Sequence, residues 1–182
     1  MSPSAMISTN PAPTLADFTS PGLILPQLRG RDASAVIQEL SQVLQSEQRV
    51  PDLRLFHQTV LNRESLMSSD LEAGMAFPHA RLPVLKKLSF AFGRSQQPIN
   101  WSGQAGSKVQ MVFLMAVPED DSGQYLSLIS GLARLAKDRR LVEKLLTAPD
   151  AVQMFAALQE IKLRTHPAPA PLPAPVSPNL SP

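Results

Sequence analysis

The sequence predicts a single α/β domain in which helices cover both faces of a central mixed β-sheet. Residues 109–117 form a nearly continuous apolar run, which is typical of a strand that is buried on both faces. Other segments repeat apolar residues at the helical period of 3.6, as Val36, Ile37 and Leu40 do. The chain has 182 residues and is 43% hydrophobic, which suffices for one core and would crowd two domains.

The first part of the domain is predicted to hold one strand and two helices. Residues 23–28 are mostly apolar and precede a turn, as a short strand would. Asp32 or Ser34 then caps a helix that carries the first apolar stripe. A Pro-Asp pair at positions 51–52 opens a second amphipathic helix, which we expect to end near Glu64.

The second part is predicted to supply the rest of the sheet and its other cover. The polar residues 65–74 are expected to form a loop before a short strand at 75–78, and residues 88–93 alternate as a strand should. The acidic turn at 119–122 favours a helix start, and the helix behind it carries Tyr125 on its apolar stripe. Two more helices are expected at 139–146 and 150–161.

Both ends of the chain are predicted to be disordered. Residues 1–19 mix Ser, Pro, Thr and Ala without periodicity, and residues 164–182 alternate Pro with small residues. Such compositions bury too little apolar surface to order a chain. The domain is therefore expected to span residues 20–163.

Composition excludes several classes of function. Lys and Arg number 17 against 15 Asp and Glu, and they are scattered, so no nucleic-acid partner is expected. The absence of cysteine excludes disulfides and thiolate metal sites, and it fits a cytoplasmic protein. The first twenty residues lack the features of a secretory signal, and the longest apolar run is too short to span a bilayer, so no direct membrane insertion is expected.

Histidines are the main candidates for chemistry, because Gly-rich phosphate loops, paired-histidine zinc spacings and GxSxG elbows are all missing from the sequence. His166 lies in the Pro-rich tail and is expected to be inert, and His57 lies among apolar residues of a predicted helix, as a packing residue would. His79 follows a short strand and Pro78, which would present its side chain at the end of the sheet. A histidine beside a proline is not in itself a motif.

The surroundings of His79 resemble the signature of a known family. Residues 63–81 read RESLMSSDLEAGMAFPHAR, which is similar to the Arg-Glu pair and the Gly-Ile-Ala-Ile-Pro-His-Ala-Arg segment of the fructose/mannitol/nitrogen-type IIA domains of the bacterial sugar phosphotransferase system. Residues 98–101, Pro-Ile-Asn-Trp, resemble a turn of the same family. The agreement continues through the strand at 112–114 and the helix at 126–137.

The resemblance implies a phosphocarrier with the fold of the mannitol-specific IIA domain. His79 would accept a phosphoryl group from HPr or its nitrogen-branch homologue, and would pass it to a separate IIB component or use it as a regulatory signal. Arg63, Ser69 and Tyr125 would contact the phosphate. The proposed chemistry needs no cofactor and no metal.

Each of the phosphate-binding candidates also has an ordinary structural explanation. Arg63 could pair with Glu64, Ser69 could serve a turn, and Tyr125 could merely pack against the core. Arg81 would serve partner binding or solubility.

Two departures from the family pattern favour an alternative function. Asp70 and Glu72 stand where the family has glycines, and two carboxylates near an incoming phosphate are unfavourable unless they point away. Many members carry a second histidine where this chain has Tyr125, and a phenol cannot become cationic as imidazole can. The alternative is a IIA-like regulatory binding module without phosphate turnover; an unrelated α/β binding domain is the third hypothesis.

Overall fold

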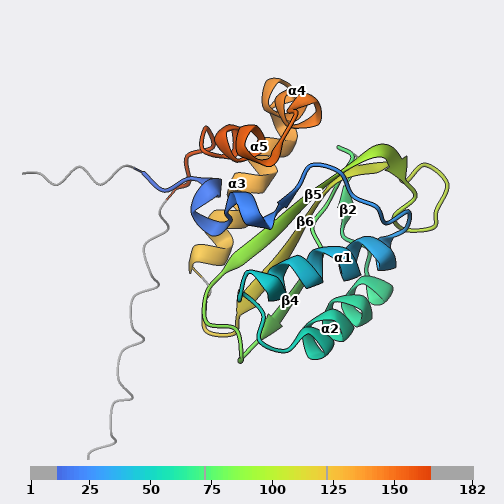
Figure 1. Ribbon diagram of the computed structural model, residues 1–182, viewed down its shortest axis with the longest axis vertical. Coiled ribbons are helices and arrows are strands. Elements are labelled where there is room, and N and C mark those ends of the chain that lie inside the picture. The colour runs from blue at the N-terminus through green and yellow to red at the C-terminus, as the bar shows by residue number, and fades with distance from the viewer. Residues whose placement is uncertain (1–11, 72, 122, 165–182) are drawn as a thin grey trace, which may run out of the picture.

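An open sheet of six strands runs through the part of the chain described by the computed structural model, residues 12–71, 73–121 and 123–164 (Figure 1). The long antiparallel pair of β5 (Ser89–Ile99) and β6 (Val109–Pro118) forms its centre. β1 (Ile24–Leu25) pairs with β5 in parallel, and β2 (Asp70–Leu71) is antiparallel to β3 (Met75–Ala76). The sheet is therefore mixed, as predicted.

Two short strands lie one after the other along β6 and bring the chain to His79. β3 runs parallel to β6 at residues 111–112, and β4 (His79–Leu82) continues parallel to it at residues 115–118. His79 follows the strand β3, as predicted, but the expectation that the pairing of the sheet ends there is wrong. Pro78 breaks the strand because it has no N–H to give to the sheet, and pairing resumes at His79.

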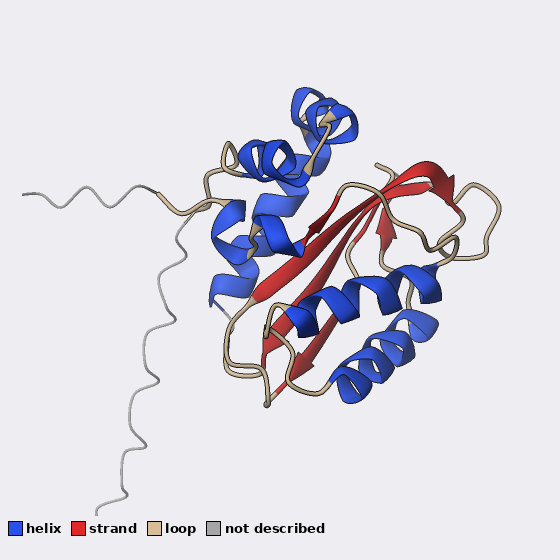
Figure 2. Cartoon of the chain, viewed as in Figure 1, coloured by secondary structure: helices blue, strands red, loops and turns tan. Residues whose placement is uncertain are grey.

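Helices cover both faces of the sheet, which confirms the predicted architecture (Figure 2). Phe113 and Met115 of β6 point into one half of the core, whereas Val112 and Leu114 point into the other. The alternation explains why the run is apolar at every position. The first half is covered by α3 (Gly123–Lys137), α4 (Arg139–Thr147) and α5 (Ala151–Leu158), and the second by α1 (Ala33–Ser46) and α2 (Leu53–Leu66).

Aspartate side chains begin four of the five helices. Each accepts a hydrogen bond from the backbone N–H three residues ahead, which satisfies one of the free donors of the first turn. The capping residues are Asp32, Asp52, Asp138 and Asp150.

Among the described residues, no helix combines the length and the apolar character that crossing a bilayer would need.

The N-terminal boundary of the domain lies before the predicted residue 20. Residues Leu15–Phe18 form a short 3₁₀ helix, η1, and Leu15 is fully buried in the core that α3 and α5 share. The Leu15 N–H donates to the Ile161 carbonyl at 3.1 Å. The prediction missed this segment because its partners are distant in sequence and the surrounding composition resembles a linker. Residues 1–11 and 165–182 lie outside the described residues.

Other boundaries differ by a few residues. The predicted strand at 23–28 shrinks to β1, because Pro21 opens a second 3₁₀ helix, η2 (Pro21–Leu23), and Pro26 follows the strand. The predicted loop at 65–74 contains the last residues of α2 and the strand β2. α5 ends at Leu158, before the predicted residue 161.

Arg94 of β5 donates hydrogen bonds to carbonyl oxygens at the C-terminal end of α4. Its Nη1 lies 2.8, 3.0 and 2.7 Å from the carbonyl oxygens of Leu145, Leu146 and Ala148, and its Nε donates to the Pro26 carbonyl at 3.0 Å. These carbonyls at the helix end have no partner within the helix, so a cation there is favourable. Burial lowers the pKa of Arg94 from its ordinary value.

We expect Arg94→Met to lower the free energy of unfolding by about 2 kcal/mol, because it removes a charged donor and leaves part-buried carbonyls unpaired. Urea denaturation followed by circular dichroism measures this change. Arg54→Met, at an exposed position of α2, is the matched control. Equal unfolding midpoints for the two variants would contradict the assigned role of Arg94.

Candidate functional site

The imidazole of His79 is held by the backbone of the segment that precedes it. His79 is the first residue of β4, opposite Met115 in β6, and its side chain is partly buried. Its Nδ1 lies 3.1 Å from the carbonyl oxygen of Phe77. A carbonyl can only accept, so this contact requires the proton to be on Nδ1. The lone pair of a neutral ring is therefore on Nε2.

Tyr125 lies over this second nitrogen from the first turns of α3. Its hydroxyl oxygen is 3.4 Å from His79 Nε2, and the two rings are 5.9 Å apart between centroids. Because Nε2 carries the lone pair, the phenol donates. The sequence left two roles for Tyr125, hydrogen bonding or packing, and the structure shows both, since its ring also packs against the core below α3.

Arg81 links β4 to the turn before α3. Its Nη1 donates to the carbonyl oxygens of Glu119 at 3.0 Å and Asp121 at 3.4 Å. The guanidinium carbon lies 5.2 Å from the centroid of the Tyr125 ring, within the range of a cation–π contact. Arg81 is exposed, as the sequence led us to expect, but it is tied to the site.

The electrostatic surroundings keep His79 neutral. Burial is the largest influence and lowers the pKa of the imidazole below its ordinary value of 6.5. The hydrogen bond to Phe77 and the charge of Glu64 act in the opposite direction, but the positive charges of Arg63 and Arg81 add to the effect of burial. At neutral pH the ring is therefore an uncharged nucleophile.

We expect the His79 ring to titrate below pH 6.5 in the folded protein, as followed by the ¹⁵N resonances of its side chain. The unfolded chain then takes up this proton at a higher pH than the folded chain does. The histidine therefore lowers the free energy of unfolding as the pH falls from about 6.5 through the folded pKa. Arg63→Met should raise the midpoint. A midpoint at or above 6.5 in the native protein would contradict this account.

Arg63 and Ser69 lie on the segment that approaches His79 from α2. Arg63 is an exposed residue of the last turn of α2, and among the described residues it forms no ion pair with Glu64. The Ser69 carbonyl accepts from the Phe77 N–H at 3.2 Å, next to the carbonyl that holds His79. The Ser69 hydroxyl is buried and has no hydrogen-bond partner in the described part of the chain. No hydrogen bond there joins it to His79.

Glu64 has a role that sequence reasoning missed. Its Oε1 accepts from the indole N–H of Trp101 at 2.7 Å and from the backbone N–H of Ser69 at 2.7 Å. One carboxylate oxygen thus holds the loop after α2 against the turn after β5. The Arg-Glu and Pro-Ile-Asn-Trp segments of the sequence were the available signal, but nothing in the sequence indicated that they meet.

The carboxylate of Asp70 also accepts hydrogen bonds. Its two carboxylate oxygens accept from the hydroxyls of Ser68 at 2.5 Å and Ser107 at 2.7 Å. Partial burial acts to raise the pKa of Asp70, but these hydrogen bonds outweigh it and the pKa is lowered. The carboxylate that the sequence suggested would repel phosphate thus serves as an acceptor that ties β2 to the loop before β6. Glu72 lies outside the described residues.

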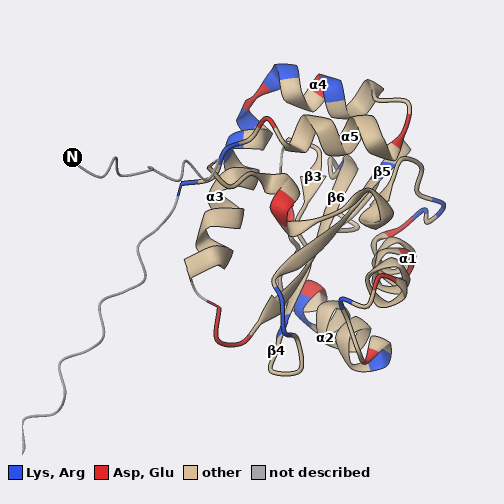
Figure 3. Ribbon diagram, turned by 60° about the vertical axis from the view of Figure 1, so that its left-hand side comes forward, with Lys and Arg blue, Asp and Glu red and all other residues tan. Residues whose placement is uncertain are grey.

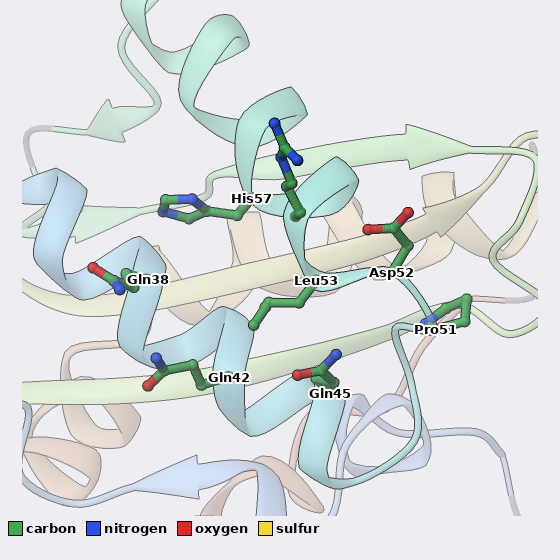
Figure 4. A pocket seen from close by; sticks show the side chains of 8 residues that line it. Gln38, Gln42, Gln45, Pro51, Asp52, Leu53 and His57 are labelled. Atoms are coloured by element: carbon green, nitrogen blue, oxygen red, sulfur yellow. The ribbon is translucent and has the colours of Figure 1, made fainter.

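A hollow lies between α1 and α2, at residues that do not take part in the His79 site (Figure 4). It measures about 540 Å³ and is lined by Gln38 and Gln42 of α1 and by His57 of α2, among others. His57 is partly buried, as predicted for a packing residue, and its Nε2 has no partner among the described residues. His166 lies outside that part of the chain. Residues 12–71, 73–121 and 123–164 contain no cluster of ligand side chains that could hold a metal.

Comparisons with known proteins identify the family to which the chain belongs. Residues 17–161 match the family described as phosphoenolpyruvate-dependent sugar phosphotransferase system, EIIA 2. The chain is 31% identical to the nitrogen regulatory protein of Bradyrhizobium diazoefficiens over 144 residues, which are 79% of this chain and 94% of that protein.

Solved structures show the same fold. The crystal structure of nitrogen regulatory protein IIA-Ntr from Neisseria meningitidis superposes with a TM-score of 0.67 at 25% identity, over 79% of this chain and 98% of that one. Enzyme IIA of mannitol from Escherichia coli, solved in complex with phosphorylated enzyme IIB, gives a TM-score of 0.65 at 16% identity, over 75% and 94% of the two chains. The chain thus belongs to the EIIA 2 family of the phosphoenolpyruvate-dependent sugar phosphotransferase system, and its relatives include nitrogen regulatory proteins of the IIA-Ntr type and a fructose-like EIIA component.

Proposed function

We propose that this protein accepts a phosphoryl group on Nε2 of His79 from the phosphohistidine of an HPr-type carrier or its nitrogen-branch homologue. The observation that carries the proposal is the bond between Nδ1 and the Phe77 carbonyl, which leaves the lone pair on Nε2. The lowered pKa of His79 supports it, because the ring is then neutral at physiological pH.

In the transfer, phosphorus exchanges its bond to the donor's nitrogen for a bond to Nε2 of His79. The lone pair of Nε2 forms a bond to phosphorus while the donor's P–N bond breaks, and that electron pair returns to the donor's imidazole. The His79 proton stays on Nδ1, held by Phe77. Phosphorylated on Nε2 and protonated on Nδ1, the ring is a good leaving group for the next transfer.

Three side chains would stabilise the phosphoryl group during transfer. The transition state is loose and metaphosphate-like, so positioning and charge neutralisation matter more than covalent help. Arg63 supplies positive charge that reaches His79. The buried, unpartnered hydroxyl of Ser69 and the phenol of Tyr125 are the available uncharged donors.

The phosphoryl group would leave to a separate IIB component or serve as a regulatory signal. The complex formed by the mannitol enzyme IIA with phosphorylated IIB supports the first destination, and the likeness to nitrogen regulatory proteins supports the second. The cytoplasmic location expected from the cysteine-free sequence is part of the same proposal.

The alternative is a regulatory binding module that does not turn over phosphate. One observation favours it: the Tyr125 hydroxyl lies on Nε2, where a donor must approach. Phosphorylation requires this phenol to turn from the nitrogen toward a phosphoryl oxygen.

Incubation with phosphoenolpyruvate, enzyme I and either HPr or the nitrogen-branch carrier tests the proposal. Intact-mass spectrometry should show the gain of one acid-labile phosphoryl group, absent from a folded His79→Gln variant. No gain with either donor pair would reject the phosphocarrier and leave the binding module. A gain that persists in His79→Gln would reject His79 as the acceptor.

A further inference from the structure

The position of Tyr125 depends on a contact that the proposed reaction does not itself require. Tyr125 belongs to α3, and its hydroxyl lies near His79 Nε2. The turn of residues 119–121, red in Figure 3, comes between the end of β6 and the start of α3. Arg81 lies beside that end of β6, since it pairs with Val117 in the parallel register of β4. It is thus placed to reach both the turn and the tyrosine.

Arg81 uses two properties of its guanidinium at once. Its Nη1 donates to the carbonyls of Glu119 and Asp121, which fixes the turn. Its guanidinium carbon also lies over the Tyr125 ring, 5.2 Å from the centroid. Asp121 in turn accepts from the Gln124 N–H through its side chain at 3.0 Å, so the fixed turn also sets the start of α3. Lysine keeps the charge but lacks the planar group that makes both contacts.

We propose that Arg81 is a positioning residue that holds the Tyr125 hydroxyl on Nε2 of His79 and thereby sets how fast a phosphoryl group leaves this nitrogen. The inference rests on the phosphocarrier function proposed above. Arg81 acts through Tyr125 and through the turn of residues 119–121, not by touching the phosphoryl group.

The effect on rate follows from what Tyr125 does once Nε2 carries phosphate. The phenol then donates to a phosphoryl oxygen, and its ring covers one approach to phosphorus. In the loss of the group to water, the water oxygen forms a bond to phosphorus as the P–Nε2 bond breaks. The electron pair returns to the imidazole, and the water protons leave with inorganic phosphate or pass to solvent. A tyrosine held in place opposes this attack by hydrogen bonding to the bound group and by excluding water. A tyrosine released from Arg81 opposes it less.

Three variants distinguish the positioning of Tyr125 from the charge of Arg81: Arg81→Lys, Arg81→Met and Tyr125→Phe. Arg81→Lys should speed the loss of phosphate from His79 by roughly threefold to tenfold, the size of one hydrogen bond or cation–π contact. It should raise the His79 titration midpoint less than Arg81→Met does, because only the methionine variant also removes the charge that lowers this pKa. Arg54→Lys, at an exposed position of α2, is the control and should match the native protein in both measurements.

The double variant Arg81→Lys/Tyr125→Phe tests whether the two residues act as a unit. Its rate of phosphate loss should exceed that of Tyr125→Phe by a smaller factor than Arg81→Lys exceeds the native rate, because the hydroxyl is already absent and only the exclusion of water by the ring remains to be lost. Multiplied effects of the two substitutions, or an Arg81→Lys variant with the native rate, would overturn the proposal.

A readout without phosphate separates this inference from the function on which it rests. In the unphosphorylated protein, the ¹⁵N resonance of His79 Nε2 reports the hydrogen bond from Tyr125, and Arg81→Lys should shift it toward its position in Tyr125→Phe. If the native protein accepts no phosphate but this shift is seen, the phosphocarrier function fails and the positioning role stands. An unshifted resonance in Arg81→Lys overturns the positioning role whether or not phosphate is accepted.

Discussion

Arg63→Met is expected to slow phosphoryl uptake by His79 about 100-fold, because it removes the cation that neutralises charge in the transition state. Arg63 is exposed at the end of α2, makes no ion pair among the described residues, and acts on His79 through its charge. The same features predict little loss of stability, so the effect should be confined to transfer.

Rapid-quench measurement of a single turnover from phosphorylated carrier gives this rate. Arg54→Met, which removes an exposed arginine from the same helix, should keep the native rate and excludes a general effect of net charge on docking. Arg63→Lys should recover part of the loss, since it restores charge without the planar donor set. A rate within twofold of native for Arg63→Met would show that this arginine takes no part in transfer.

Glu64→Ala is expected to lower the free energy of unfolding by about 3 kcal/mol, because two well-formed hydrogen bonds lose their acceptor together. The indole N–H of the buried Trp101 and the N–H of the partly buried Ser69 both donate to Glu64 Oε1. Removing the carboxylate leaves both donors without this partner and frees the loop that leads to β2.

Glu64→Gln is the matched variant, since its amide oxygen can take the place of Oε1 and accept from both donors. We expect it to cost less than half as much as the alanine substitution. Urea denaturation followed by Trp101 fluorescence measures both, and Trp101 also reports directly on the contact that is changed. Equal losses for the two variants would indicate that side-chain packing, and not the hydrogen bonds, explains the stability.

Features that arise within one segment could be predicted from the sequence. The run at 109–117 is apolar throughout because neighbouring residues face opposite halves of the core, and this pattern correctly indicated a strand covered on both faces. Asp32 and Asp52 cap the helices that follow them, as their places before apolar stripes indicated. Both signals lie within a few residues of the structure they specify.

Features that join distant segments could not be predicted in the same way. Glu64 meets Trp101, and Asp70 meets Ser107, each across 37 residues of sequence. Single-sequence patterns contain no information on such pairs, so the sequence indicated the charge of Asp70 but not the two hydrogen bonds that its carboxylate accepts. Leu15 was assigned to a tail for the same reason, since the core that buries it includes α5, at the other end of the domain.

The candidate site falls between these two cases. The family signature indicated His79, and the strand before it indicated its place at the sheet. The choice of nitrogen depends on the Phe77 carbonyl, and the contact of Tyr125 with Nε2 depends on how α3 packs, so both needed the three-dimensional structure.

The most direct test of the account is the identity of the phosphorylated atom. Protein labelled with ¹⁵N in its histidine rings, phosphorylated through enzyme I and an HPr-type carrier, can be examined for coupling between ¹⁵N and ³¹P. Coupling to Nε2 of His79 is expected, with the proton retained on Nδ1. Coupling to Nδ1, or a phosphoryl group on His57 or another residue, would contradict it.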